Sequence, residues 1–195
     1  MPRPTATLLL VSATLISACG KKSADDALLA ELAPSEWVDA AANFKSPAGD
    51  DIGHVVLADA IGGVLLRVDV KGLAPGWHGI HLHMIADCSD GAGGFKASGA
   101  HVDPENHEHG LVNPAGSERG DLPNIYAGAD SRATAEFFRA GLNLYPSEQG
   151  AATNGPFPLM DDDGFAVIIH ANADDHSTQP IGGAGDRVAC AAIKG

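Results

Sequence analysis

The stretch that decides the fold class is VLLRVDV, residues 64–70, in which apolar and polar side chains alternate from Leu66 onward. Such alternation is typical of a strand with one buried face. Turn-forming clusters separate most of the other apolar runs of strand length. These runs are Trp37–Phe44, His54–Ala60, Gly79–His83, Thr134–Leu142, Phe165–His170 and Arg187–Ile193. Since no segment after the N-terminal leader keeps a helical period, the sequence predicts an all-β antiparallel sandwich or barrel.

Two stretches between these runs, Ile85–Tyr126 and Asn172–Asp186, are too long and too poor in apolar residues to be hairpin turns. Long structured loops on a β scaffold usually carry function. The chain has 195 residues, of which 45% are hydrophobic and 19% charged, which suits one core. We therefore expect a single domain with two long functional loops.

The first residues, MPRPTATLLLVSATLISACG, place Arg3 before an apolar run that ends near Cys19. This pattern is typical of a secretory signal and is too short to span a bilayer. Residues 16–19, ISAC, resemble the bacterial lipobox, whose cysteine is acylated and becomes the first mature residue. An ordinary cleavage site close to Cys19 is the alternative.

On the lipobox interpretation, residues 1–18 are a lipoprotein signal peptide, residues 19–34 a lipidated N-terminus and flexible tether, and residues 35–195 the folded domain. The protein is then exported and held by its lipid on the periplasmic side of a bacterial membrane. Gly20 after the cysteine favours the outer membrane.

Without Cys19 the cysteines form an even pair, Cys88 and Cys190. In an oxidising compartment a disulfide between them is the expected state, and two buried free thiols are the alternative. The formal net charge of −13 makes nucleic acid and anionic membrane surfaces poor partners. A negative substrate remains compatible if the field is reversed locally at the site.

Nine histidines make a metal hypothesis worth testing, although spacing matters more than number. In residues 80–83, IHLH, the alternation places His81 and His83 on one face of a strand, where both can bind one ion. Further donors are offered by His101, His109, Asp121 and His170. Imidazole suits copper and zinc alike, so these side chains could build a site for two metals.

Five separated motifs occur in a fixed order. They are GWHGIHLH (76–83), GAHVDP (99–104), GDLPN (120–124), VIIH (167–170) followed by ADDH (173–176), and GGAGDRVAC (182–190). Together they resemble the copper,zinc superoxide dismutase family from about Gly62 to Ile193. Ala86, where glycine is usual, is a minor departure.

The resemblance implies an eight-stranded Greek-key β-barrel and the dismutation of superoxide to dioxygen and hydrogen peroxide. His101 would bridge the two metals and carry a proton during turnover, and Arg187 would attract the anion. Asp174 would link a copper ligand to a zinc ligand, Cys88 and Cys190 would form the family's disulfide, and His78 would be structural. The implied ligands are His81, His83, His101 and His170 for copper, and His101, His109 and Asp121 for zinc.

The fourth zinc ligand of the family should be a histidine three residues before Asp121, and this position holds Glu118. A glutamate oxygen can bind zinc, so Glu118 can complete the site. Alternatively, Glu118 turns outward toward Arg119 or solvent, and His107 or water completes the site. A third interpretation is an empty zinc site with copper-only chemistry.

A copper-holding or copper-delivering lipoprotein without turnover is the competing function. The bridging His101 and Arg187 argue against it, because simple binding needs neither. The sequence is compatible with a homodimer and assigns no role to His54, His107 or His176.

Overall fold

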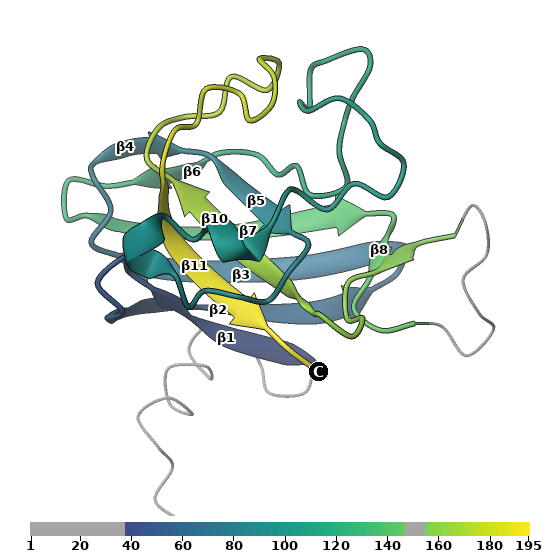
Figure 1. Ribbon diagram of the computed structural model, residues 1–195, viewed down its shortest axis with the longest axis horizontal. Helices are drawn as coiled ribbons and strands as arrows, with labels where there is room; N and C mark the ends of the chain where they lie inside the picture. Colours follow the sequence, from purple (N-terminus) through teal and green to yellow (C-terminus); the bar gives the residue numbers. More distant parts are fainter. Residues whose placement is uncertain (1–37, 147–154) are drawn as a thin grey trace, which may run out of the picture.

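Seven antiparallel strands pair in one curled sheet in the order β5-β10-β11-β1-β2-β3-β7 (Figure 1). In this computed structural model, residues 38–146 and 155–195 are described. The expected signal peptide, Cys19 and the tether lie outside the described residues. The strands of the sheet are β1 (Ala40–Lys45), β2 (Asp51–Ala60), β3 (Gly63–Lys71), β5 (Ile80–His83), β7 (Arg132–Ala140), β10 (Phe165–His170) and β11 (Arg187–Ile193).

The alternation of apolar and polar residues in β3 matches the alternation of buried and partly exposed side chains. Its even-numbered residues, from Val64 to Val70, are at most 1% exposed, whereas Arg67 and Asp69 between them are partly exposed. The even-numbered side chains face the interior of the curled sheet and belong to the main hydrophobic core. The period of two therefore defines which face of the strand is inside.

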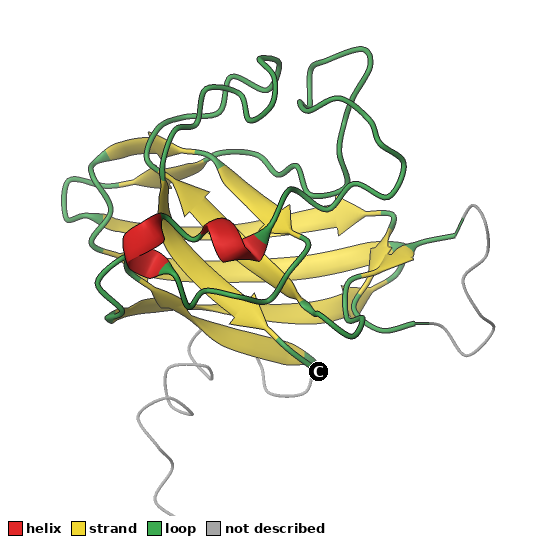
Figure 2. Ribbon diagram, viewed as in Figure 1, coloured by secondary structure: helices red, strands yellow, loops and turns green. Residues whose placement is uncertain are grey.

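The curled sheet is closed by two short strands, β4 (Gly76–His78) and β6 (Ile125–Ala127), which pair with each other. Strand β4 continues into β5 after Gly79, and β6 packs beside β7. With β4 and β5 counted as one interrupted strand, the barrel has the eight strands that the resemblance implied. Figure 2 shows that strands dominate and that the described helices are two short turns, η2 (Gly91–Gly93) and η3 (Lys96–Ser98).

The sequence did not predict every strand. Strand β6 falls almost wholly within the stretch expected to be a loop, because a strand of three residues between Asn124 and Gly128 carries too little periodicity to detect. A second small pair, β8 (Leu142–Asn143) with β9 (Phe157–Pro158), was also not predicted.

Strands β10 and β5 are buried on both faces. Their inner face lies in the barrel core, and part of the outer face is covered by the first long loop, whose Phe95 packs on Ala166 and Ile168. The disulfide Cys88–Cys190, with a Cα–Cα distance of 5.8 Å, ties this loop to β11. Both long loops lie on the same side of the barrel, next to β5 and β10 (Figure 1). No helix in the described part of the chain has the length and apolar character to cross a membrane.

Candidate metal centre

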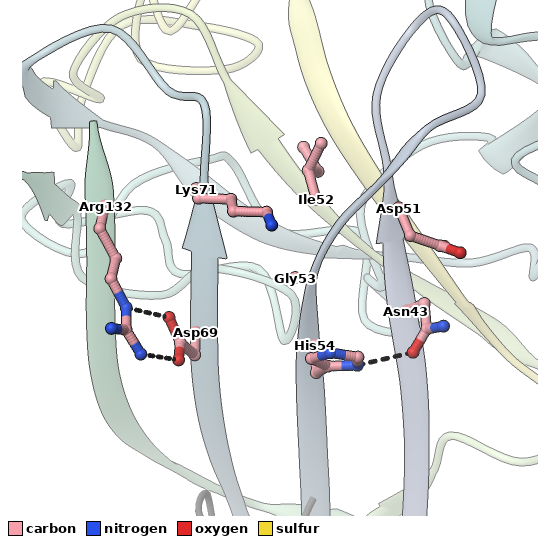
Figure 3. A pocket seen from close by; sticks show the side chains of 8 residues that line it. All are labelled: Asn43, Asp51, Ile52, Gly53, His54, Asp69, Lys71 and Arg132. Atoms are coloured by element: carbon pink, nitrogen blue, oxygen red, sulfur yellow. Dashed lines mark hydrogen bonds and ion pairs between the residues drawn. The ribbon is translucent and has the colours of Figure 1, made fainter. Parts of the chain in front are cut away.

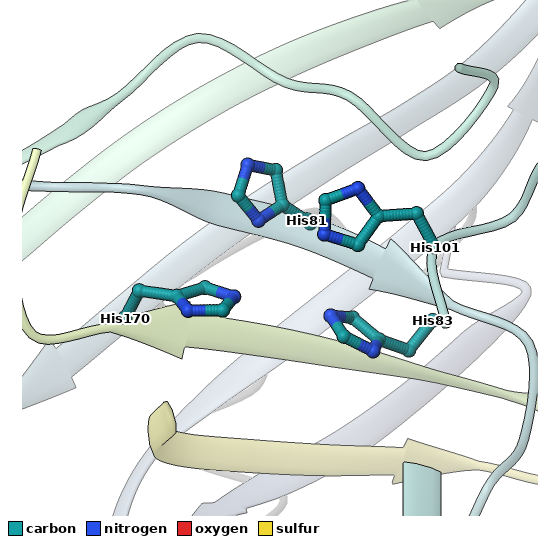
Figure 4. Close-up of side chains that lie close together, drawn as sticks. All are labelled: His81, His83, His101 and His170. Atoms are coloured by element: carbon teal, nitrogen blue, oxygen red, sulfur yellow. The ribbon is translucent and has the colours of Figure 1, made fainter. Parts of the chain in front are cut away.

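Four histidine side chains converge on the outer face of the barrel, beneath the long loops (Figure 4). His81 and His83 project from β5, and His170 is the last residue of the neighbouring strand β10. His101 arrives from the first long loop through an isolated bridge to His83. Each ring offers one nitrogen, and these nitrogens all lie within 4.8 Å of one another.

In three of these rings, one nitrogen donates a hydrogen bond that orients the ring. Nε2 of His81 donates to Oδ2 of Asp174 at 2.8 Å. Nδ1 of His83 donates to the carbonyl of Gly99 at 2.9 Å, and Nδ1 of His170 donates to the carbonyl of Gly185 at 3.0 Å. The opposite nitrogen of each ring is thereby left as a lone-pair donor.

These opposite nitrogens have no hydrogen-bond partner among the described residues, although they are buried. They are Nδ1 of His81 and Nε2 of His83 and His170, and Nε2 of His101 is a fourth buried nitrogen without a partner. A buried polar atom without a partner is costly and needs an explanation. Four such nitrogens pointing at one another provide the donor set of a metal site with all-imidazole coordination, as copper accepts.

The three rings fixed by Asp174, Gly99 and Gly185 are held neutral, as metal binding requires. Burial lowers the pKa of His81 to about 4 and that of His170 to about 3, despite the hydrogen bonds that oppose it. Burial also places the pKa of His83 well below its usual range, and the positive charge of Arg187 contributes. At neutral pH each of these rings is therefore uncharged, with its proton on the hydrogen-bonding nitrogen and a free lone pair on the other.

A second cluster begins at the other nitrogen of His101. Nδ1 of His101 lies 2.6 Å from Oε2 of Glu118 and 3.5 Å from Oδ1 of Asp121. Nδ1 of His109 lies 3.2 Å and 2.7 Å from the same two oxygens. His101 therefore joins the two clusters, and the second consists of two imidazoles and two carboxylates, which is a donor set that zinc accepts.

The carboxylates of the second cluster favour positive charge on the groups that they contact. Burial works against protonation of His109, but its hydrogen bonds to Asp121, Asp174 and Glu118 outweigh burial and raise its pKa to about 11. Burial alone would raise the pKa of Glu118 and Asp121. Their hydrogen bonds to the imidazoles of His101 and His109 outweigh burial and lower the pKa of both carboxyl groups. Without a metal, protons on the imidazoles supply the charge that a divalent cation would supply.

Asp174 connects the two clusters. Its Oδ2 accepts from His81, and its Oδ1 lies 3.1 Å from Nε2 of His109. Its backbone is fixed by reciprocal hydrogen bonds with the Asn124 side chain, each 2.8 Å long. Gly182 has a φ of +61°, and a Cβ there would lie 1.6 Å from Oδ1 of Asp174, so only glycine lets the second loop approach this carboxylate.

Arg187 lies directly across from His170 in the pairing of β11 with β10. Its guanidinium donates to the carbonyls of Phe95 and Gly99 and to Oγ of Ser98, over 2.7–2.9 Å. Gly99 thus accepts from both Arg187 and His83. The first long loop is held against the histidine cluster, with a cation beside it.

The remaining histidines lie outside both clusters. The nitrogens of His78 lie 2.7 Å from the carbonyl oxygens of His170 and Ala74, which fits the expected structural role. His54 donates to Asn43 in a hollow on the outer face of the sheet, over β1, β2, β3 and β7 (Figure 3). His107 contacts the Ser117 carbonyl, and His176 contacts Asn124.

Comparison with known proteins now identifies the family. The family model of copper/zinc superoxide dismutase (SODC) matches residues 52–193. The chain is 49% identical over 156 residues to "Superoxide dismutase [Cu-Zn]" of Caulobacter vibrioides, covering 80% of this chain and 85% of the relative. The chain belongs to the copper/zinc superoxide dismutase family.

Other members of the copper/zinc superoxide dismutase family agree with this assignment. "Superoxide dismutase [Cu-Zn] 2" of Aquifex aeolicus is 31% identical, over 86% of this chain and 93% of the relative. A solved double mutant of a SOD-like protein from Bacillus subtilis superposes with a TM-score of 0.72 at 30% identity, covering 80% of this chain and 97% of that one. The Cu/Zn superoxide dismutase from Brucella abortus gives a TM-score of 0.57 at 30% identity, covering 78% and 97%.

In this member of the dismutase family, the side chains predicted from the sequence to bind metal come together as the two adjoining clusters. Glu118 faces into the second cluster, whereas the neighbouring Arg119 turns away and donates to Glu105 at 2.8 Å. Sequence reasoning missed three residues whose side chains bond the backbone of the second cluster, Arg139, Gln179 and Asn113. One signal for Arg139 was available, because the alternation of β7 assigns this charged residue to the core-facing side.

Proposed function

We propose that this protein disproportionates superoxide to dioxygen and hydrogen peroxide at a copper ion held by His81, His83, His101 and His170. The observation that carries the proposal is the set of four buried, unpartnered imidazole nitrogens within 4.8 Å of one another. The neutral rings and fixed tautomers of His81, His83 and His170 suit copper binding. Membership of the dismutase family supports the same assignment.

We further propose that zinc occupies the second site through His101, His109, Asp121 and Glu118. The inward carboxylate of Glu118 favours this interpretation over the two alternatives, an outward Glu118 and an empty site. Oε2 of Glu118 lies within 3.2 Å of the ring nitrogens of both His101 and His109. His107, the other candidate ligand, uses its Nδ1 to contact the Ser117 carbonyl at 3.0 Å.

The chemistry divides between the metals and the side chains. When bound, copper would supply the one-electron exchange, and zinc would polarise His101. Overall, one superoxide is oxidised to dioxygen, while the other gains one electron and two protons to become hydrogen peroxide. Arg187 attracts the anion and orients it by hydrogen bonding. His101 holds a proton at Nε2 when that atom is not a ligand and gives it to the peroxide, and water supplies the second proton.

Purified protein loaded with copper and zinc should consume superoxide, and a His83→Ala variant that retains its disulfide should lose both copper and activity. Pulse radiolysis measures the consumption, and elemental analysis measures the metals. One copper per chain without superoxide consumption would contradict the proposal and favour a copper-holding protein.

The proposed location is the periplasmic side of a bacterial membrane, with the protein anchored by lipid at Cys19. The leader sequence and the lipobox-like ISAC support this location. The Cys88–Cys190 disulfide is consistent with it, because such bonds persist in oxidising compartments.

A further inference from the structure

A charged side chain occupies a core-facing position at the end of strand β7. Arg139 pairs with Val64 of β3 in the register, and the preceding pair on the same side joins Phe137 to Leu66. Val64, Leu66 and Phe137 are all buried in the barrel core. In a strand, residues two apart share a face, so Arg139 continues the apolar row where the barrel ends.

The guanidinium of Arg139 donates hydrogen bonds to the turn that carries Glu118. Nη2 donates to the Glu118 carbonyl at 2.7 Å and to Oγ of Ser117 at 3.1 Å. Nε donates to the Arg119 carbonyl at 2.9 Å. Three bonds from one rigid plane thus fix the peptide groups directly around Glu118, which a flexible ammonium cannot reproduce.

Other bonds hold the same turn from inside. The backbone N–H of Glu118 donates to Oδ2 of Asp121 at 3.0 Å, and the N–H of Asp121 donates back to the Glu118 carbonyl at 3.2 Å. The Glu118 carbonyl therefore accepts from both Asp121 and Arg139. These bonds couple the backbone of Glu118 to the carboxylate of the second acidic donor.

We propose that Arg139 is a positioning residue that aims the carboxylate of Glu118 into the second metal site by clamping the carbonyls of Glu118 and Arg119. A glutamate has one more rotatable bond than the histidine usual at this position, so its oxygen is aimed only if its backbone is fixed. The inference rests on the proposed function because it takes Glu118 as a metal ligand. It adds a residue of β7 to the residues that decide zinc affinity.

The test measures zinc affinity of the metal-free, disulfide-intact protein by competition with a chromophoric chelator, which does not depend on turnover. Arg139→Lys keeps the charge and should weaken zinc about 10–100-fold, the usual effect of losing a partner that orients a ligand. The visible absorption of Co²⁺ in the second site should also change. Copper affinity and the thermal midpoint of the metal-free protein should stay near wild type.

The matched control is Arg132→Lys, at the other end of the same strand. Arg132 forms an ion pair with Asp69 in the outer-face hollow over β1, β2, β3 and β7 (Figure 3), so this variant should bind zinc as the wild type does. An equal loss of zinc affinity in both variants would overturn the inference.

A double-mutant cycle with Glu118→Gln separates this inference from the proposed function. If Arg139 acts through Glu118, Arg139→Lys should weaken zinc little in the Glu118→Gln background. Fully additive losses would overturn the clamp but leave Glu118 a ligand. An unchanged zinc affinity in Glu118→Gln itself would instead remove Glu118 from the proposed zinc site.

Discussion

Oε2 of Glu118 lies 2.6 Å from Nδ1 of His101, the nitrogen opposite the one that faces the other three histidines of the first cluster. One imidazole ring therefore separates a carboxylate from the proposed copper. Since this position holds histidine elsewhere in the family pattern, the second site carries one more negative charge than usual. In the proposed two-metal site, that charge would act on both metals through His101.

Replacing Glu118 with histidine should raise the copper reduction potential, because removal of a nearby negative charge disfavours the more positive oxidation state. Zinc should remain at one ion per chain. Spectroelectrochemistry measures the potential, and elemental analysis measures the zinc. A copper reduction potential equal to that of the wild type, with zinc retained, would show that the charge of Glu118 has no effect on copper.

Arg187→Gln should lower kcat/KM about tenfold, because a cation beside the site increases the encounter rate with an anion. The dependence of the rate on ionic strength should become weaker, while copper content stays the same. Arg187→Lys should recover part of the rate, since it keeps the charge but loses the bonds to Phe95, Ser98 and Gly99. Arg67→Gln, on the partly exposed face of β3, serves as the control. If Arg187→Gln were as active as this control, Arg187 would have only a structural role.

Removing the disulfide with Cys88→Ser and Cys190→Ser should lower the free energy of unfolding of the metal-free protein by about 4–5 kcal/mol. The two cysteines are 102 residues apart, and a closed loop of this length restricts the unfolded chain strongly. Urea unfolding monitored by tryptophan fluorescence gives the value. Reducing the wild type should produce a similar loss, and no loss in either case would be contrary to this expectation.

The metal-free protein should be most stable near pH 6.5. His81, His83 and His170 have lowered pKa values when folded, so the unfolded chain binds more protons and stability is lost as pH falls from about 6.5 toward 4. His101 and His109 have raised pKa values, so their contribution is full below about 6.5 and is lost as pH rises through the folded pKa, about 11 for His109. Each histidine contributes at most about 1.4 kcal/mol per pH unit.

Urea titrations of chelator-treated protein between pH 4.5 and 9 measure this profile. His170→Gln should reduce the acid slope by about one proton. A flat unfolding midpoint from pH 4.5 to 6.5 would mean that the three buried rings do not stay neutral.

Cys19→Ser should abolish incorporation of labelled palmitate in a bacterial host and release the protein from the membrane fraction. The expectation follows from the lipobox-like residues 16–19. Cys88→Ser serves as the control, because it alters a cysteine of the folded domain only. Palmitate incorporation that persists in Cys19→Ser would disprove the anchor.

The sequence by itself determined three of the four histidines of the first cluster and the barrel strands that hold them. His81 and His83 are two apart on a strand, and His170 ends a strand of its own, so local periodicity is enough to present their rings. The disulfide was also predicted from the sequence, because the leader indicates an oxidising compartment and the folded domain contains one pair of cysteines. Strand β6 could not be predicted, since three residues give no measurable period.

Only the tertiary structure decided how Glu118 joins the second cluster. The sequence left Glu118 free to face zinc, Arg119 or solvent, because the direction of a loop side chain depends on groups distant in the chain. Glu105 binds Arg119, and Arg139, 21 residues beyond Glu118, holds the Glu118 carbonyl. No local pattern records such contacts, since loop closure and burial bring these groups together only when the barrel is formed.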